Sequence, residues 1–508
     1  MATMPTINNS KIPDYVTHVT KTLEKADFEA FLVGGCVRDL ILGREPKDWD
    51  ITTNANPEEI IALFEKTIYE NKFGTVGVCV PINEENNVTH VTKYHIIEVT
   101  PYRTEAKYSD FRHPDEVLFS KNIEDDLKRR DFTINALAYN VENGQIIDFY
   151  KGQTDIKDKV IRAVGKPDDR FQEDALRMLR AVRFSVQLDF AVSYETMQSI
   201  AENKDLIKNV SFERIRDEFT KIIESHNSMQ GIGLLQKLGL LKYIIPELEE
   251  GIGCIQGGAH KYDVFVHLLE ALNHASEKDW PLEIRLAALF HDIGKPKSRR
   301  DGTKKEYTFY GHEVIGARLA KQIMERLKYP KKSIDLVVSL VRNHMFFSDT
   351  EQISLSAVRR IVQKVGKEHI WDLMNVRECD RVGMSKSEAP YRLRKYHAMI
   401  EEVLRDPISV GQLAIDGKYM MNMELHPPTE DGRTGIKPGP RMGWILNALL
   451  EEVLDDPTKN TKEHLSELVS SLDMLGDAEL KTLGERGKET KEKLEEEEID
   501  KLHKKHGV

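Results

Sequence analysis

The sequence has few cysteines, few aromatic residues and no long apolar run. Its four cysteines, at positions 36, 79, 254 and 379, form no pair at metal-knuckle or redox-motif spacing, so reduced thiols in a cytoplasmic protein are the simplest account. No apolar stretch is long enough to cross a membrane, and the polar N-terminus lacks a signal-peptide core. These absences predict a cytoplasmic protein without a membrane partner.

The overall charge is acidic. A net charge of −11 argues against a large nonspecific nucleic-acid surface. A local basic groove remains compatible with this charge, because much of the acid lies in Glu-rich helices and in a Lys/Glu run after about residue 475. The oligomeric state is left open by the sequence.

The periodicity of apolar residues changes along the chain, which is long enough for several domains. Short apolar strands alternate with helices up to about residue 150, and helical periodicity dominates from about 152 onward. We therefore predict an α/β head followed by all-α domains. The predicted segments are an N-terminal segment 1–27, a head 28–155, a helical neck and body 156–254, a histidine-rich helical domain 255–385, a C-terminal helical region 386–474 and a charged tail 475–508.

The most informative segment begins at two glycines. Residues 31–33 read as a short buried strand, and residues 37–42 resume as a helix. Gly34 and Gly35 between them let the backbone approach a ligand closely. Amides at such a helix start, with Arg38 beside them, suit a nucleotide triphosphate.

Two acids follow this turn. Asp48 and Asp50 are two residues apart in a predicted strand over 48–53, so both carboxylates should point to the same face. Two like charges that close need a cation between them, and hard oxygen ligands favour Mg²⁺. The turn and the acids together predict metal-dependent attack on a nucleotide phosphate.

This segment resembles the signature of the nucleotidyltransferases that include CCA-adding enzymes and bacterial poly(A) polymerases. The resemblance implies a small mixed sheet with helices in the head, followed by a helical neck, an HD domain and C-terminal helices. It also implies metal-binding catalytic roles for Asp48 and Asp50, and for Glu98, an acid on the strand after the turn at 74–77. The matching positions are Gly34, Gly35, Val37, Arg38, Asp39, Leu42, Gly43, Asp48, Asp50 and Thr53.

Two further head segments carry the resemblance. Residues 103–118 are polar and are predicted to form a mobile loop, which the family's complete CCA-adding enzymes keep at this place. Residues 126–136 resemble the family's sugar-recognising motif. There Arg130 and Asp131 would contact the nucleotide, with Asp131 and Asn135 near the ribose. A carboxylate or amide can read the 2′-hydroxyl directly.

Residues 171–184 are predicted to form one amphipathic helix with arginines every three residues. Asp174 and Arg177 would lie one turn apart, and an ordinary salt bridge, including Glu173 with Arg177, is the alternative. The pattern resembles the family's base-selection motif. A carboxylate accepting from an exocyclic amine, beside a guanidinium that donates to the ring, favours CTP and ATP over UTP and GTP. Arg180 is predicted to contact phosphate or to be structural.

The histidine-rich domain suggests a second chemistry. His267, the adjacent His291 and Asp292, and Asp380 resemble the H…HD…D ligands of HD-type metal phosphohydrolases. Such ligands suit a divalent ion such as Ni²⁺, Mn²⁺ or Mg²⁺. His312 and His344 could add ligands for a second metal or bind phosphate, and a decayed domain kept for packing is the alternative.

The leading interpretation is addition of CCA to tRNA 3′ ends from CTP and ATP, with release of pyrophosphate. The C-terminal segments 413–417 and 438–443 look like the tRNA-contacting region of family members that contain an HD domain. The resemblance to such members also implies phosphatase or 2′,3′-cyclic phosphodiesterase activity. The alternatives are a poly(A) polymerase, an enzyme that adds only A, and a metal phosphohydrolase whose head binds RNA without catalysis.

Overall fold

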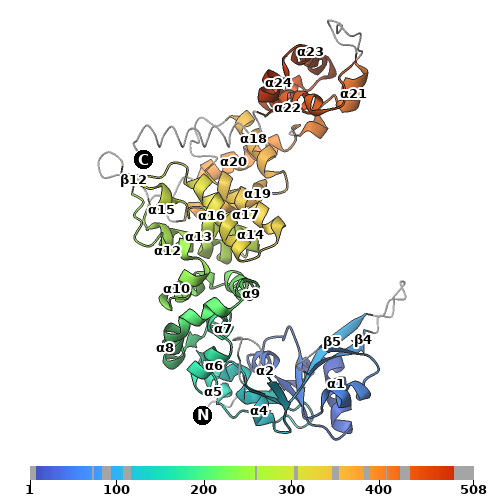
Figure 1. The fold of residues 1–508 in the computed structure, drawn as a ribbon, viewed down its shortest axis with the longest axis vertical. Helices are drawn as coiled ribbons and strands as arrows, with labels where there is room; N and C mark the ends of the chain where they lie inside the picture. Colours follow the sequence, from blue (N-terminus) through green and yellow to red (C-terminus); the bar gives the residue numbers. More distant parts are fainter. Residues whose placement is uncertain are drawn as a thin grey trace. The chain divides into compact units, whose positions relative to one another are not determined.

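The computed structural model divides into two compact units, Met1–Glu249 with Glu325–Tyr329 and Glu250–Met324 with Pro330–Val508 (Figure 1). The first unit holds a mixed sheet and a helical neck, and the second is largely helical, as the sequence predicts. Among the described residues, no helix is long and apolar enough to span a membrane. The structure describes residues 7–70, 74–82, 93–106, 116–257, 260–301, 307–345, 354–382, 390–407, 409–423 and 435–485.

The head is built on one seven-stranded sheet with the order β3-β4-β5-β2-β1-β8-β9. Only β2 and β5 pair in parallel within it, and the other neighbours are antiparallel. The mixed sheet therefore places β2 at its centre, between β5 and β1. The strands are β1 Ala30–Val33, β2 Asp50–Thr53, β3 Thr67–Glu70, β4 Thr75–Pro81, β5 Tyr94–Pro101, β8 Ala138–Tyr139 and β9 Ile146–Ile147.

The predicted strand, glycine turn and helix are confirmed. All residues of β1 are buried, and the turn residue Gly34 has a φ of 82°, a conformation that favours glycine. The helix α2 spans Gly35–Ile41 and so starts two residues before the predicted start. The other helices of residues 7–151 are the short η1 Asn9–Lys11, α1 Asp14–Lys25, α3 Pro57–Leu63, α4 Ile123–Lys128 and the short η3 Thr133–Asn135.

Two predicted segments of the head have other bounds in the structure. The strand predicted to hold both acids begins at Asp50, and Asp48 lies in the bend before it. Its neighbour β1 already ends at Val33 and turns into α2, so residues before Asp50 have no strand to pair with on that side. The polar segment 103–118 contains the antiparallel strands β6 Arg103–Ala106 and β7 Glu116–Phe119, and residues 107–115 lie outside the described residues.

The predicted continuous helix over 171–184 is wrong. It is two helices, α6 Pro167–Glu173 and α7 Leu176–Leu188, with Asp174 extended between them at φ −144°. The Asp174 carboxylate accepts a hydrogen bond from the Leu176 backbone, which stabilises the break. The neck also contains α5 Gly152–Lys157, α8 Tyr194–Asn203, η4 Lys204–Asn209, α9 Phe212–Ile223, α10 Ser228–Lys237, α11 Leu241–Ile244, α12 Pro246–Glu249 and the short parallel pair β10 Val160–Ile161 with β11 Ala191–Val192.

The second unit is a stack of helices with one small departure from the all-α prediction, the two-residue pair β12 Arg300–Asp301 and β13 Tyr307–Thr308. Alanines of α13 and α14 pack with Cys379 of α19 in a buried core. The helix α24 lies within the predicted charged tail and buries Leu480, and residues 486–508 lie outside the described residues. The helices are α13 Val264–Glu277, α14 Leu282–Phe290, α15 Lys295–Ser298, α16 His312–Arg326, α17 Lys331–Asn343, α18 Leu355–Val365, α19 Ile370–Asp380, α20 Pro390–Val403, η6 Val410–Gln412, α21 Gly417–Asn422, α22 Pro440–Asp455, η7 Pro457–Lys459, α23 Lys462–Asp473 and α24 Asp477–Glu485.

Candidate functional site

The acids of the head meet at the centre of the sheet. Asp50 and Glu98 are register partners on the parallel strands β2 and β5, so their side chains leave the same face of the sheet. Burial raises the pKa of Asp50, the Arg130 charge lowers it, and the nearby charge of Asp48 raises it further. A divalent cation would relieve the repulsion between these carboxylates, and their oxygens are ligands that suit a hard ion.

The glycine turn lies directly against these groups. A Cβ added to Gly34 would lie 3.0 Å from Nη1 of Arg130 and 3.8 Å from Oδ2 of Asp50. A side chain at this position would therefore intrude between the turn and the predicted metal ligands. The structure thus brings together Gly34, Asp50 and Arg130, which lie almost a hundred residues apart in the sequence.

The predicted triphosphate and sugar residues form one hydrogen-bonded chain. Arg38 Nη1 donates to Oδ1 of Asn135 over 2.7 Å, and Asn135 Nδ2 donates to Oδ1 of Asp131 over 3.2 Å. This series of hydrogen bonds ends at Arg180 of α7, which donates through Nε to Oδ2 of Asp131 over 2.7 Å. Arg38 also donates to its neighbour Asp39. These contacts fix Asp131 and Asn135 in place from both sides.

Asp131 is charged at neutral pH. Burial opposes the charge of this carboxylate, but Arg180 and Arg177 together with the Asn135 amide lower its pKa to about 2. The side chain is only 8 % exposed, so little water screens these contacts. Asp131 therefore presents a fixed negative charge at the edge of the neighbouring pocket.

That pocket has a volume of about 250 Å³ and collects five of the residues predicted from the sequence. Its polar walls carry more cationic than anionic side chains, which suits an anionic ligand such as a nucleotide. Its lining also includes Arg129 and Arg214, which the sequence reading did not assign to a site. The lining residues are Arg129, Arg130, Asp131, Asp174, Leu176, Arg177, Arg180 and Arg214.

The two predicted base-reading residues, Asp174 and Arg177, both line the pocket, but their side chains are not paired with each other. Arg177 Nη1 instead contacts Oε2 of Glu173 at 2.6 Å, the ordinary salt bridge that the sequence left as an alternative. Asp174 is held by Arg214 of α9, whose Nη2 and Nη1 donate to its two carboxylate oxygens over 2.8 and 3.2 Å. Sequence spacing could not find Arg214, because it lies forty residues from Asp174.

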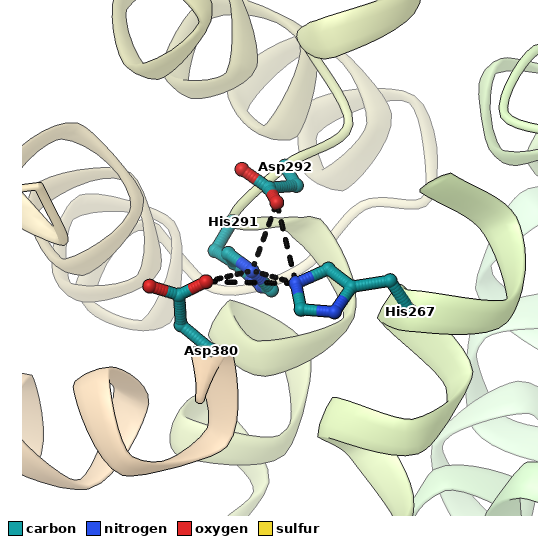
Figure 2. A group of neighbouring side chains, drawn as sticks. All are labelled: His267, His291, Asp292 and Asp380. Carbon is teal, nitrogen blue, oxygen red and sulfur yellow. Dashed lines mark hydrogen bonds and ion pairs between the residues drawn. The ribbon is translucent and has the colours of Figure 1, made fainter. Parts of the chain in front are cut away.

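The histidines and acids of the second unit form a buried cluster (Figure 2). Nε2 of His267 and Nε2 of His291 lie 3.1 Å apart, and each lies 3.3 Å from Oδ2 of Asp292 and 3.5 Å from Oδ1 of Asp380. The helix α13, the end of α14 and the end of α19 supply these side chains. Four converging ligand atoms of this kind can hold a metal ion.

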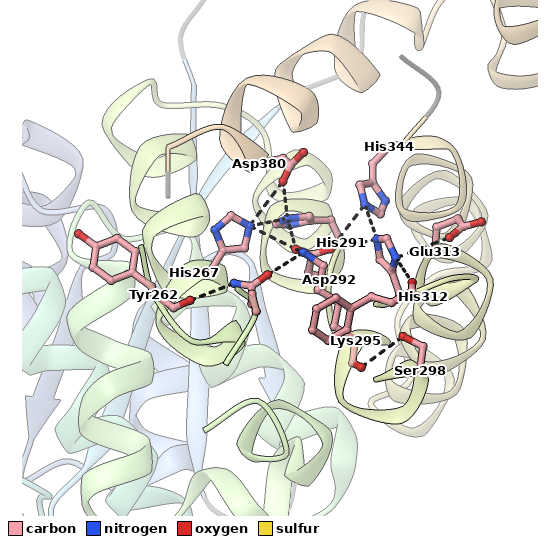
Figure 3. Close-up of polar contacts among 12 residues, drawn as sticks. Tyr262, His267, His291, Asp292, Lys295, Ser298, His312, Glu313, His344 and Asp380 are labelled. Carbon is pink, nitrogen blue, oxygen red and sulfur yellow. Dashed lines mark hydrogen bonds and ion pairs between the residues drawn. The ribbon is translucent and has the colours of Figure 1, made fainter. Parts of the chain in front are cut away.

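The other oxygen of Asp292 faces a second group (Figure 3). Its Oδ1 lies 3.2 Å from Nε2 of His312 and 3.6 Å from Nε2 of His344, and these two nitrogens are 3.3 Å apart. The three residues are buried and form a second possible metal site. Asp292 therefore has the position of a carboxylate that bridges two ions.

Charges in the cluster are strongly coupled. Burial opposes a charged imidazole, but the carboxylates of Asp292 and Asp380 raise the pKa of His291 to about 10. Burial would also raise the pKa of Asp292, yet Lys295 and His291 hold it well below its usual range. The sequence reading missed Lys295, although it lies in the same short motif as His291 and Asp292.

Protein-family comparisons agree with this layout. A family model described as "Poly A polymerase head domain" matches residues 30–162, and one described as "Probable RNA and SrmB-binding site of polymerase A" matches residues 189–252. The model described as "HD domain" matches residues 264–378. The acid-bearing sheet thus falls in the first match and the His/Asp cluster in the third, except for Asp380 just beyond its end.

Curated relatives extend the similarity over most of the chain. A CCA-adding enzyme of Lactobacillus helveticus is 32% identical over 471 residues, which is 92% of this chain and all of the relative. The chain belongs to the CCA-adding enzyme family. A CCA-adding enzyme of Levilactobacillus brevis is 44% identical over 448 residues, covering 88% of this chain and 95% of the relative.

A solved CCA-adding enzyme shares the fold. The Bacillus stearothermophilus CCA-adding enzyme in complex with CTP has a TM-score of 0.66 at 26% identity, covering 91% of this chain and 99% of that one. The Thermotoga maritima CCA-adding enzyme complexed with tRNA has a TM-score of 0.56 at 20% identity, covering 92% and 97%, and supports the fold alone. The α/β head followed by largely helical domains is therefore a fold that CCA-adding enzymes use.

Proposed function

We propose that this protein adds C, C and A to the 3′ end of tRNA from CTP and ATP, with release of pyrophosphate. The observation that carries the proposal is the register of Asp50 with Glu98, which puts two carboxylates on one face of the sheet beside the Gly34 turn. In a chain that belongs to the CCA-adding enzyme family, this is the arrangement that nucleotidyl transfer requires.

The head residues divide the work of transfer. Asp48, Asp50 and Glu98 would hold Mg²⁺, which when bound activates the 3′-hydroxyl of tRNA and neutralises the charge on the phosphates. The backbone of Gly34 and Gly35 would cradle the triphosphate at the start of α2. These groups align the α-phosphorus of the nucleotide with the attacking hydroxyl.

Residues of the head and the neck would together select the nucleotide. Asp131 and Asn135 would accept from and donate to the ribose hydroxyls, with Arg38 and Arg180 holding them in position. Asp174 would accept from the exocyclic amine that cytosine and adenine both carry. Arg130 and Arg177 line the same pocket and would donate to the phosphate or to the base ring.

Nucleotide incorporation tests the transfer proposal. A tRNA that lacks its CCA end should receive three defined additions from CTP plus ATP. An unlimited ladder from ATP alone would indicate a poly(A) polymerase, and failure to extend a tRNA ending before the first C would indicate an A-only enzyme. Asp48→Ala should abolish transfer, whereas Glu58→Ala, an exposed acid on α3, should leave it unchanged.

We further propose that the HD domain is a metal-dependent phosphohydrolase acting on phosphomonoesters or 2′,3′-cyclic phosphates. Asp292 lies between two pairs of histidines, and this position favours two divalent ions, for which Ni²⁺, Mn²⁺ and Mg²⁺ are candidates. The first pair is His267 and His291, and the second is His312 and His344. His291→Ala should abolish hydrolysis and leave CCA addition intact. If the metal-loaded native protein hydrolyses neither substrate, the domain is a packing element.

Three further predictions from the sequence belong to this proposal. They are the domain boundaries, the contact of the C-terminal helices with tRNA and the cytoplasmic location. The buried, free state of all four cysteines supports the last of these, because such thiols are typical of a reducing compartment.

A further inference from the structure

One cationic side chain, Lys295, lies inside the HD cluster and is not one of its candidate metal ligands. Lys295, at the start of α15, is only 6 % exposed. Its Nζ lies 2.5 Å from Oδ2 of Asp292 and donates to Oε1 of the buried Gln256 over 2.7 Å (Figure 3). A buried ammonium is costly unless it is paired, so Lys295 and Asp292 stabilise each other's charge.

The oxygen that pairs with Lys295 is the one that a metal needs. Oδ2 of Asp292 also lies 3.3 Å from Nε2 of His267 and 3.3 Å from Nε2 of His291. A metal ion among these atoms would lie about 2 Å from Oδ2. An ammonium 2.5 Å from the same oxygen would then face a divalent charge at close range in a buried site, where repulsion is large.

We propose that Lys295 is an internal cation that the metal displaces, and that the displaced ammonium binds the phosphate group of the HD domain's substrate. In the structure the ammonium pairs with Oδ2 of Asp292. In the metal-bound protein it turns from Oδ2 of Asp292 toward the incoming anion. This inference rests on the proposed metal site of the HD domain and assigns that site a phosphate-binding residue.

The surroundings of Lys295 support an anion site. His260 lies beside the cluster, with its ring centroid 5.5 Å from that of His267, and its buried Nδ1 has no hydrogen-bond partner among the described residues. An imidazole N–H and an ammonium can both donate to phosphate oxygens. Bound divalent ions would add further positive charge beside them, which favours an anion over a neutral ligand.

Lys295→Met tests displacement by the metal. The variant keeps the length of the side chain and removes its charge, so the full-length protein should bind Ni²⁺ at least about tenfold more tightly in competition with a coloured chelator. Lys297→Met is the matched control, because Lys297 lies on the same short helix and pairs with Glu250 at 3.6 Å, away from the cluster. Lys295→Arg keeps the charge and should bind Ni²⁺ as the native protein does. The His291→Ala protein gives the Ni²⁺ binding that belongs to the head.

Inorganic phosphate tests the anion site. Calorimetric titration of phosphate into the Ni²⁺-loaded protein should give at least about tenfold weaker binding for Lys295→Met than for the native protein and Lys297→Met. Equal Ni²⁺ affinity in the native protein and Lys295→Met would overturn the displacement, and equal phosphate affinity would overturn the anion site. Absence of Ni²⁺ binding beyond the His291→Ala background in all variants would overturn the metal site itself, and this inference with it.

Discussion

Replacing Arg214 by lysine should weaken the discrimination of CTP and ATP from UTP. Arg214 donates two hydrogen bonds to the Asp174 carboxylate, and a lysine can keep the charge but replace only one of them. A charge-assisted hydrogen bond contributes about 1.5–3 kcal/mol. We take the lower figure, because the Arg214 and Asp174 side chains are 23 % and 16 % exposed and water screens the pair.

A loss of about 1.5 kcal/mol corresponds to about a tenfold change. The Arg214→Lys protein should therefore show about tenfold lower kcat/KM for CTP and ATP, because Asp174 is no longer fixed where it would meet the amine of the base. UTP lacks that amine and should be affected less. Arg214→Met loses both hydrogen bonds and should lower kcat/KM for CTP and ATP by about a hundredfold.

Single-nucleotide incorporation into tRNA, with the concentration of each NTP varied separately, measures kcat/KM for each nucleotide and gives the ratio of kcat/KM for CTP over UTP. Arg216→Lys is the matched control, because Arg216 lies on the same helix and pairs with Asp217 outside the pocket. An unchanged ratio of kcat/KM for CTP over UTP in Arg214→Lys would refute the positioning role of Arg214. An equal fall for all four nucleotides would indicate damage to the head rather than to base selection.

The remaining predictions concern backbone packing, pH and metal removal. Gly294→Ala would place a Cβ 2.2 Å from the backbone oxygen of His312, so the HD domain should lose Ni²⁺ binding while CCA addition persists. The control is Gly233→Ala, whose added Cβ would meet no atom within 4 Å. The pKa of Asp131 is lowered from 3.8 to about 2 in the folded protein. The charged carboxylate therefore stabilises the folded state at pH values above about 3.8, and this contribution is lost as the pH falls through about 2. Asp131→Asn should therefore lower the free energy of unfolding by about 2 kcal/mol at pH 7, and by progressively less between pH 4 and pH 2, in denaturant titrations. A chelator should abolish nucleotide transfer and added Mg²⁺ should restore it; transfer that persists without divalent ions would contradict the role of Asp48.

Local patterns predicted single elements well. The buried β1, the glycine turn and α2 follow from short-range periodicity, and the ends of helices carry the HD ligands where the motif places them. The pairing of Asp50 with Glu98 lies beyond such patterns, because β2 and β5 are neighbours only in a sheet whose strand order departs from sequence order. The resemblance to nucleotidyltransferases supplied that assignment.

The incorrect and missing assignments depend on contacts that periodicity along one element does not describe. Helical periodicity runs through Asp174 without interruption, but at the break its carboxylate accepts a hydrogen bond from the Leu176 backbone and also binds Arg214 on another helix. Lys295 reads as an ordinary solvated lysine, but in the structure it is buried and donates to Gln256, which lies 39 residues away. Spacing rules describe neighbours along one element and carry no information on these partners.

The register between β2 and β5 limits how this protein can change in evolution. Alternate residues of a strand face opposite sides, so one residue inserted between Tyr94 and Glu98 would turn Glu98 away from Asp50 unless the whole strand slid back. A substitution can be reversed by one further mutation at the same position, but such a length change needs a second length change to compensate it. Variation in the length of β5 among descendants should therefore be rarer than variation in its composition.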